Sequence, residues 1–361
     1  MTDSLSHSNL PGRLGNPDLQ LGTDPRADSR LIEVLAQFGM DVQSEPAPVT
    51  ADSSYEDCLA FSREMEVGYE AIYGALHQGL SDLAITRSKE IIKGIDGNEI
   101  VLYIHRPPDV DDDLPCILHI HGGAMVLLTA TDVNFVRWRD ELASEGMVVV
   151  GVEFRNGGGV LGNHPYPAGL NDCASAIRWV HENKTSLGVS HIVVSGESGG
   201  GNLSVATALK AKQEDWLDEI AGVYALCPYI SGLYADPPPD LLSLRENDGY
   251  TVNVEMMGAL AKIYDPTGAN KKNPLTWPFQ ADVSDLEGLP PHCISVNELD
   301  PLRDEGLSYH RMLSAAGVLS ESRVVLGTCH GGDCISPSVI PDIYAATIRD
   351  ISRFTKSLID I

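Results

Sequence analysis

The residues best suited to catalysis are a serine and the glycines around it. Gly196-Glu197-Ser198-Gly199-Gly200 follows the apolar run 191–195 and precedes a helix-like stretch, 202–212. This G-x-S-x-G pattern between a strand and a helix is typical of a nucleophile elbow, which exposes the serine hydroxyl at a helix N-terminus. Side chains two positions before and after the serine would collide in so sharp a turn, which explains both glycines. Taken alone, the motif also fits an ordinary glycine-rich turn or a phosphate cradle.

A second motif, His121-Gly122-Gly123-Ala124, directly follows the apolar run 116–120. Ester hydrolysis passes through a tetrahedral intermediate whose oxyanion needs preorganised hydrogen-bond donors. Glycines at a strand end let backbone N–H groups turn toward such an anion. We therefore expect the N–H groups of Gly123, Ala124 and Gly199 to form an oxyanion hole; Ala124 keeps its N–H, so a third glycine is not required. A plain turn at a strand end is the alternative.

An acid and a histidine follow the last two apolar runs of the chain. Asp300 comes after the run 293–296, and His330 comes after the run 323–326. Asp300 is expected to orient the imidazole of His330, which acts as the general base. Asp304 and Glu305 lie nearby, and we interpret them as first-turn acids of the following helix.

The order of these residues is itself informative. Ser198, Asp300 and His330 follow the order serine, acid, histidine that α/β hydrolases use. Together the signals predict a serine hydrolase that needs no metal or organic cofactor. A non-catalytic ligand receptor on the same scaffold is one alternative, and loss of a triad residue would indicate it. A phosphate- or nucleotide-binding protein is another, but no lysine follows Gly200-Gly201 and no second nucleotide motif is present.

The elements that would position these residues alternate along the chain. Runs 90–95 and 99–105 flank Asp96-Gly97 and predict a β-hairpin. Short apolar runs then alternate with helical stretches; these runs are 116–120, 147–152, 191–195, 222–226, 293–296 and 323–326. Such runs suit strands that are buried on both faces. The predicted fold is therefore α/β, with a mostly parallel central sheet flanked by helices.

The N-terminal region shows a helical pattern and no strand signal. Residues 31–79 are helical in pattern, with a helix start at Ser53-Ser54, and residues 1–30 resemble a flexible lead. We predict an N-terminal segment and helical cap over residues 1–85 and a catalytic domain over residues 86–361. A partly helical insertion at about 229–278 interrupts the alternation of strands and helices. We expect it to lie near the active site.

The overall composition narrows the classes of partner. The chain has 361 residues, 43% of them hydrophobic, and a formal net charge of −26. This charge disfavours nucleic acid and anionic lipid as partners, and no apolar run approaches the roughly 20 residues of a membrane span. The N-terminus lacks the apolar core of a signal peptide. We expect a small-molecule ester or lactone as the partner, and the sequence does not indicate an oligomeric state.

The cysteines indicate the redox environment. Seven cysteines are scattered without a CxxC pair, which predicts reduced thiols and a cytoplasmic enzyme. Cys329 and Cys334 are close in sequence, and whether they pair is left open. No cysteine has an evident catalytic partner. Activity is therefore expected to survive thiol alkylation as well as chelators.

The motifs resemble those of the hormone-sensitive-lipase-like family of α/β hydrolases, from Lys89 to the C-terminus. The resemblance rests on residues 121–124, 164–168, 196–201 and 300–306, and on His330. It implies carboxylesterase activity, the triad Ser198, Asp300 and His330, oxyanion donors Gly123, Ala124 and Gly199, and an N-terminal helical cap over the acyl pocket. The chain departs from the usual pattern at Ala124, Glu197, Gly199 and Gly332, and in the loop before His164. These departures concern substrate preference.

Overall fold

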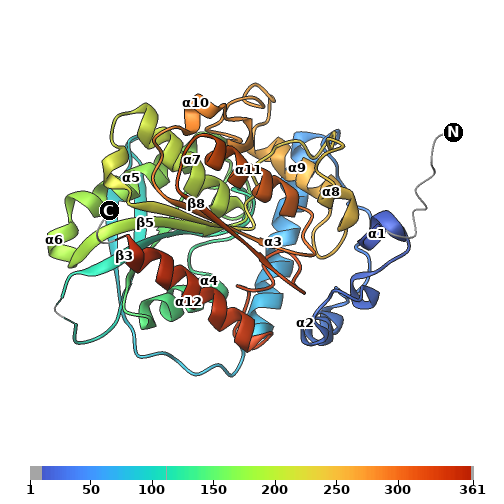
Figure 1. The fold of residues 1–361 in the computed structure, drawn as a ribbon, viewed down its shortest axis with the longest axis horizontal. Coiled ribbons are helices and arrows are strands. Elements are labelled where there is room, and N and C mark those ends of the chain that lie inside the picture. The colour runs from blue at the N-terminus through green and yellow to red at the C-terminus, as the bar shows by residue number, and fades with distance from the viewer. Residues whose placement is uncertain (1–9, 111, 359–361) are drawn as a thin grey trace.

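An eight-stranded sheet forms the centre of the protein (Figure 1). The structure is a computed structural model that describes residues 10–110 and 112–358. The strand order is β1-β2-β4-β3-β5-β6-β7-β8. β2 pairs antiparallel with β1 and β4, and the other neighbours are parallel, which confirms the predicted mostly parallel sheet. The strands are β1 Thr86–Lys93, β2 Glu99–Arg106, β3 Leu114–Ile120, β4 Val148–Glu153, β5 Val189–Glu197, β6 Gly222–Leu226, β7 His292–Asn297 and β8 Ser320–Val325.

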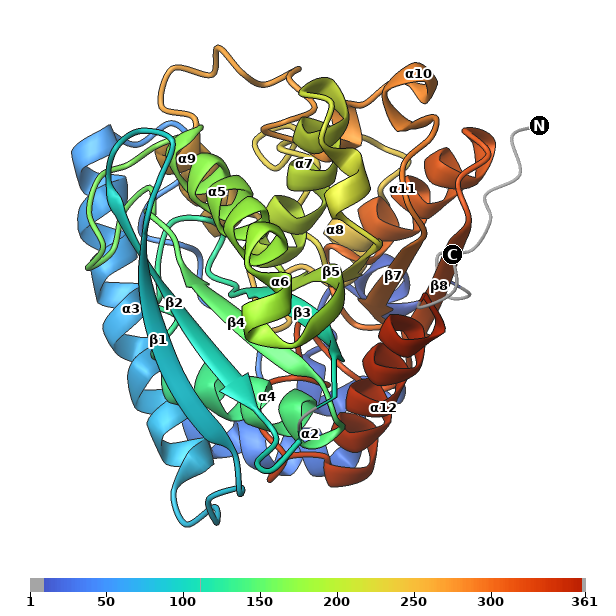
Figure 2. The ribbon, with the colours of Figure 1, turned by 90° about the vertical axis from the view of Figure 1, so that its left-hand side faces the viewer.

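Helices cover both faces of the sheet (Figure 2). α4 and α12 pack on one face, around Trp138 and Phe354. α5, α7 and α11 pack on the other face, because alternate strand residues point to opposite sides. The helices are α1 Gly12–Gly15, α2 Ser29–Leu35, α3 Tyr55–His77, α4 Val133–Ser144, α5 Ala168–Glu182, α6 Lys184–Leu187, α7 Gly199–Gln213, α8 Ser243–Glu246, α9 Val254–Tyr264, α10 Val283–Leu286, α11 Arg303–Ala315 and α12 Pro341–Ser357.

The predicted strands are confirmed, and β8 differs most from its predicted position in the sequence. The predicted hairpin is β1 and β2, and the run 222–226 coincides with β6. β8 begins at Ser320, three residues before the predicted run 323–326. β8 is an edge strand whose first residues are largely exposed and polar, so hydrophobicity does not mark its start.

The N-terminal segment is more tightly attached to the protein than predicted. The flexible lead expected for residues 1–30 is wrong for residues 10–30, and residues 1–9 lie outside the described part. Leu21 and Leu31 are fully buried and pack with Tyr250 and Leu299. The helix predicted to start at Ser53-Ser54 is α3, which begins at Tyr55 and continues to His77. α8 and α9 make the insertion at 229–278 partly helical, as predicted. The division into two domains at residue 85 stays a prediction.

Two further expectations concern membranes and thiols. Within residues 10–110 and 112–358, no helix is both long and apolar enough to cross a bilayer. All seven cysteines carry free thiols, and this includes Cys329 and Cys334. The cytoplasmic location inferred from the cysteines stays a prediction.

Candidate active site

Ser198 lies at the sharp turn between β5 and α7. Its φ and ψ of 56° and −116° are strained for a residue with a side chain. The Ser198 N–H donates to the carbonyl of Leu226 at 2.9 Å, which fixes the turn against β6. A Cβ atom at Gly196 or Gly200 would overlap the carbonyl oxygen of Ile120. Both glycines are therefore required for the elbow, as the sequence predicts.

The loop after β3 comes close to this elbow. Gly123, Ala124 and Met125 all have positive φ, of 98°, 55° and 60°. The Gly123 carbonyl accepts hydrogen bonds from Val126 and Leu127, so the loop closes on itself. A Cβ atom at Gly199 would lie 2.6 Å from the Ala124 nitrogen. The backbone segments of the three predicted oxyanion donors therefore meet beside Ser198, although the two segments are far apart in sequence.

Asp300 and His330 form a hydrogen-bonded pair. The His330 Nδ1 atom lies 2.8 Å from Asp300 Oδ2, and the other Asp300 oxygen accepts the Leu302 N–H at 2.9 Å. Asp300 is fully buried. Burial is the largest influence on the pKa of His330 and lowers it, but the Asp300 charge and hydrogen bond prevail, so that the pKa of His330 is raised above its ordinary value.

The predicted residues face one cavity. Gly123, Ala124, Ser198 and His330 line it, and Asp300 lies behind His330. Within the described residues no hydrogen bond joins the Ser198 hydroxyl to His330. Hydrogen bonds of this kind are often loose in the absence of substrate. Most of the remaining lining is apolar. α3, α9 and the N-terminal segment contribute to it, with Leu35, Met40, Met65, Tyr69, Ile72 and Met256 among their residues.

Two buried glutamates support the loop after β3, and sequence reasoning assigned no role to either. Glu197 accepts the Gly122 N–H at 2.8 Å and contacts His119 Nε2 at 3.0 Å. Glu66, on α3, accepts the N–H groups of Leu128 at 2.6 Å and Val160 at 2.7 Å. A charged residue on the buried face of α3 is the signal that could have identified Glu66.

Glu305 also differs from its predicted role. It lies in the first turn of α11, as expected, but it is buried and accepts hydrogen bonds from the Ile230 N–H at 2.7 Å and the Tyr234 hydroxyl at 2.8 Å. Burial raises the pKa of Glu305 to about 7. Its carboxylate therefore anchors the start of the insertion rather than serving only the helix dipole.

Cys227 corrects the expectation that no cysteine has a partner at the site. One ligand atom each of Cys227, Asp300 and His330 lies within 4.8 Å of the other two. These residue types could coordinate a metal ion. Because Asp300 and His330 already hydrogen-bond to each other, we interpret the cluster as an acid–base pair with an adjacent thiol. Burial raises the pKa of that thiol, and the nearby His330 opposes the shift.

The sheet order, the strained serine and the acid–histidine pair define a hydrolase of the α/β type. A family model described as alpha/beta hydrolase fold matches residues 117–332. The chain therefore belongs to this family.

Individual relatives agree with this assignment. Carboxylesterase NlhH of Mycobacterium tuberculosis is 33% identical over 280 residues, which are 75% of this chain and 83% of that protein. The solved structure of brefeldin A esterase, described as a bacterial homologue of human hormone sensitive lipase, is similar with a TM-score of 0.93 and 43% identity, covering 97% of this chain and 99% of that one. The structure of esterase Est22 has a TM-score of 0.82 and 36% identity, covering 94% and 99%. The predicted resemblance to the hormone-sensitive-lipase-like family is confirmed.

Proposed function

We propose that the protein is a serine carboxylesterase with Ser198 as nucleophile, His330 as general base and Asp300 as the orienting acid. One observation carries the proposal: the Asp300–His330 hydrogen bond of 2.8 Å lies at the cavity that Ser198 also lines. Ser198 is held there in a strained conformation that a structural serine does not need. The relatives named carboxylesterase and esterase support the same activity.

The proposed reaction has two steps. His330 takes the proton of the Ser198 hydroxyl as its oxygen attacks the ester carbonyl, and the protonated imidazole then gives this proton to the leaving alcohol. Asp300 fixes the ring so that Nε2 is free to act, because Nδ1 bonds to the carboxylate. Water, activated by the same imidazole, then cleaves the acyl-enzyme.

The oxyanion would be bound by the N–H groups of Gly123, Ala124 and Gly199. Neither Gly123 nor Ala124 uses its N–H in a hydrogen bond to another described residue, so both are free to bind an anion. Gly199 is the first residue of α7, where N–H groups have no partner within the helix. Fixed donors of this kind stabilise the developing charge without reorganisation.

The cavity lining supports a substrate with a large apolar acyl or alcohol group. Methionines from three segments line it (Met40, Met65, Met256), and such side chains adapt to irregular ligands. Tyr69 and Tyr73 line it as a stacked pair. Macrocyclic lactones fit this chemistry, and the similarity to brefeldin A esterase makes brefeldin A the first lactone to assay.

The proposal is tested by labelling and by a substrate panel. A fluorophosphonate probe should modify wild-type protein at Ser198 and leave Ser198→Ala unlabelled. Aryl esters of increasing acyl length and macrocyclic lactones should then be hydrolysed, with the apolar substrates preferred. A folded wild-type protein that neither reacts with the probe nor hydrolyses any ester would refute the function and would favour the ligand-receptor alternative.

A further inference from the structure

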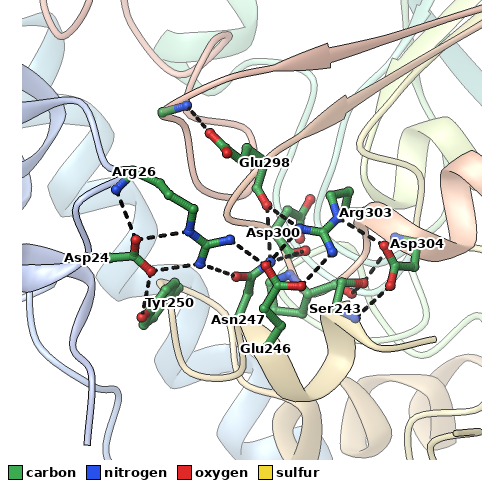
Figure 3. A network of polar contacts seen from close by, with 12 residues as sticks. Asp24, Arg26, Ser243, Glu246, Asn247, Tyr250, Glu298, Asp300, Arg303 and Asp304 are labelled. Carbon is green, nitrogen blue, oxygen red and sulfur yellow. Dashed lines mark hydrogen bonds and ion pairs between the residues drawn. The ribbon is translucent and has the colours of Figure 1, made fainter. Parts of the chain in front are cut away.

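A chain of buried and partly buried charges runs from the N-terminal segment to the loop of Asp300 (Figure 3). At its centre is Glu246 of α8, which is 2% exposed. The Arg303 guanidinium donates to Glu246 at 2.7 and 3.0 Å, and Arg26 donates to the same carboxylate from the other side. Arg26 also pairs with Asp24 at 2.7 Å. Two guanidinium groups from opposite ends of the sequence thus share one buried carboxylate.

The charge chain ends on the loop that carries Asp300. The Asn247 side-chain amide donates to the carbonyls of Glu298 and Asp300, at 3.2 and 3.1 Å. Arg26 donates to the Oδ1 atom of this amide at 3.2 Å, which turns its NH₂ group toward the loop. Arg303 donates to the Glu298 carbonyl at 2.9 Å.

The same N-terminal segment reaches the loop that carries His330. The Asp28 N–H donates to the Gly327 carbonyl at 3.0 Å, and the Gly327 N–H donates to the Glu298 carboxylate at 2.9 Å. The Leu299 N–H donates to the Thr328 carbonyl at 2.9 Å, so the two catalytic loops also bond to each other. Residues 24–28 therefore reach the His330 loop directly, through Asp28, and the Asp300 loop indirectly, because Arg26 bonds to Asn247. The alignment of these two loops sets the Asp300–His330 hydrogen bond.

We propose that Arg26 is a positioning residue for the catalytic acid–base pair, acting through Glu246 and Asn247 on the loop of Asp300. The proposal rests on the serine esterase function proposed above. Arginine suits this role because its planar fork bonds to Asp24, Glu246 and Asn247 at once, which the single ammonium of lysine cannot reproduce. The N-terminal segment then contributes to the chemical step and does more than line the pocket.

The same segment offers a matched control. Arg30 also ties the N-terminal segment to the rest of the protein, through Asp342 of α12, and it pairs with Asp28 within the segment. It donates no bond to Asn247 or to residues 298–300. If the segment matters only as a structural attachment, loss of either arginine should act alike. If Arg26 positions the acid–base pair, the two losses should differ in kcat.

The experiment compares full-length wild type, Arg26→Gln, Arg26→Lys and Arg30→Gln. We expect Arg26→Gln to lower kcat about tenfold with little change in KM, since a misplaced base slows chemistry more than binding. The rate of fluorophosphonate labelling should fall with it, Arg26→Lys should be intermediate, and Arg30→Gln should match wild type. Equal kcat in Arg26→Gln and wild type, or an equal loss in Arg30→Gln, would overturn the proposal.

A second variant covers the case in which Arg26→Gln does not fold. Asn247→Ser removes the amide that holds the Asp300 carbonyl but leaves both arginines paired with Glu246. It should lower kcat and the labelling rate in the same way, and wild-type values in folded Asn247→Ser would refute the positioning role. A wild-type protein without esterase activity or labelling would remove the proposed function and this inference together. An active wild type with unaffected variants would remove the inference alone.

Discussion

The two halves of the candidate site are built by different means. Ser198 is held by backbone packing: its N–H and carbonyl bond to Leu226 and Tyr229, and glycines leave room for the turn. The Asp300–His330 half lies on two loops that are held largely by side chains, among them Asn247 and Glu298. The nucleophile half therefore depends on small residues within a short stretch of chain. The acid–base half depends on charged groups from remote segments.

Because of this difference, we expect the two halves of the site to respond differently to amino-acid substitutions. A methyl group added at Gly200 would collide with the Ile120 carbonyl and destroy the nucleophile half, whatever the charges nearby. The acid–base half has room to relax, and loss of one charged partner leaves another in place, as Glu246 keeps Arg303 when Arg26 is lost. Graded losses of activity are expected there.

The largest effect is expected from Ser198→Ala. It should lower kcat on the order of 10⁵-fold, because the nucleophile is removed while the oxyanion donors remain. Ser195→Ala is the matched control, since Ser195 is a buried serine on β5, the strand that leads into Ser198, and its hydroxyl has no hydrogen-bond partner among the described residues. Kinetics with an aryl ester, alongside circular dichroism, measure both. If folded Ser198→Ala retains most of its activity, the mechanism is wrong.

Asp300→Asn should be the second most severe change. It should lower kcat on the order of 10³- to 10⁴-fold, because an amide favours the wrong imidazole tautomer. Asp304→Asn is the control: Asp304 bonds to Ser243 and Arg303 and not to His330. Its loss should affect thermal stability more than kcat. A greater loss of kcat in Asp304→Asn than in Asp300→Asn would show that the wrong acid was chosen.

The same contrast explains what the sequence could predict. The elbow, the alternation of strands and helices and the chain order of the triad candidates can be read directly along the sequence, and runs such as 222–226 match their strands. The supporting contacts are not local. Glu66 and Leu128 are 62 residues apart, and Arg26 and Glu246 are 220 apart. No periodicity or motif marks such pairs in one sequence, so residues 10–30 resemble a flexible lead although they are held in place by buried leucines and ion pairs.

The nucleophile half also has one remote charged support, because the Glu66 carboxylate on α3 holds the loop of the proposed oxyanion donors. The variant Glu66→Gln tests this support. Glutamine places an NH₂ donor against one of the two N–H donors of Leu128 and Val160, so the loop should loosen. We expect kcat to fall about tenfold with a smaller change in KM. The exposed Glu64→Gln on the same helix should behave as wild type. Unchanged kcat in Glu66→Gln would remove Glu66 from the support of the site.

Cys227 allows a milder perturbation of the acid–base half. Methyl methanethiosulfonate should convert the Cys227 thiol to a methyl disulfide, with release of methanesulfinate, and so place a methylthio group beside His330. This should lower activity several-fold, reversibly with dithiothreitol. The reaction should be slow, because burial raises the pKa of the thiol and leaves little thiolate. Cys227→Ala should be resistant. Cys334→Ala should remain sensitive, although Cys334 also lines the cavity. Full activity after complete modification of Cys227, checked by mass spectrometry, would contradict this expectation.

The smallest expected effect is in the pH dependence, which reports the interactions of His330 with Asp300 and with the adjacent Cys227. His330 must be neutral to accept the Ser198 proton. Burial, the largest influence, lowers the pKa of His330, but the Asp300 carboxylate beside it stabilises the protonated ring, and the net shift is upward from 6.5. Activity is therefore lost as the pH falls through a value above 6.5.

The profile of kcat/KM should accordingly rise with pH through a midpoint above 6.5, so that the enzyme at pH 6.5 works at less than half of its plateau rate. An ester that does not itself titrate in this range, with circular dichroism at each pH, separates this effect from unfolding. In Asp300→Asn the midpoint of the residual activity should move down, because the stabilising charge is gone while burial remains. Two results would contradict this expectation: a wild-type midpoint at or below 6.5, or a midpoint that Asp300→Asn leaves unchanged. Either would mean that Asp300 does not govern the protonation of His330.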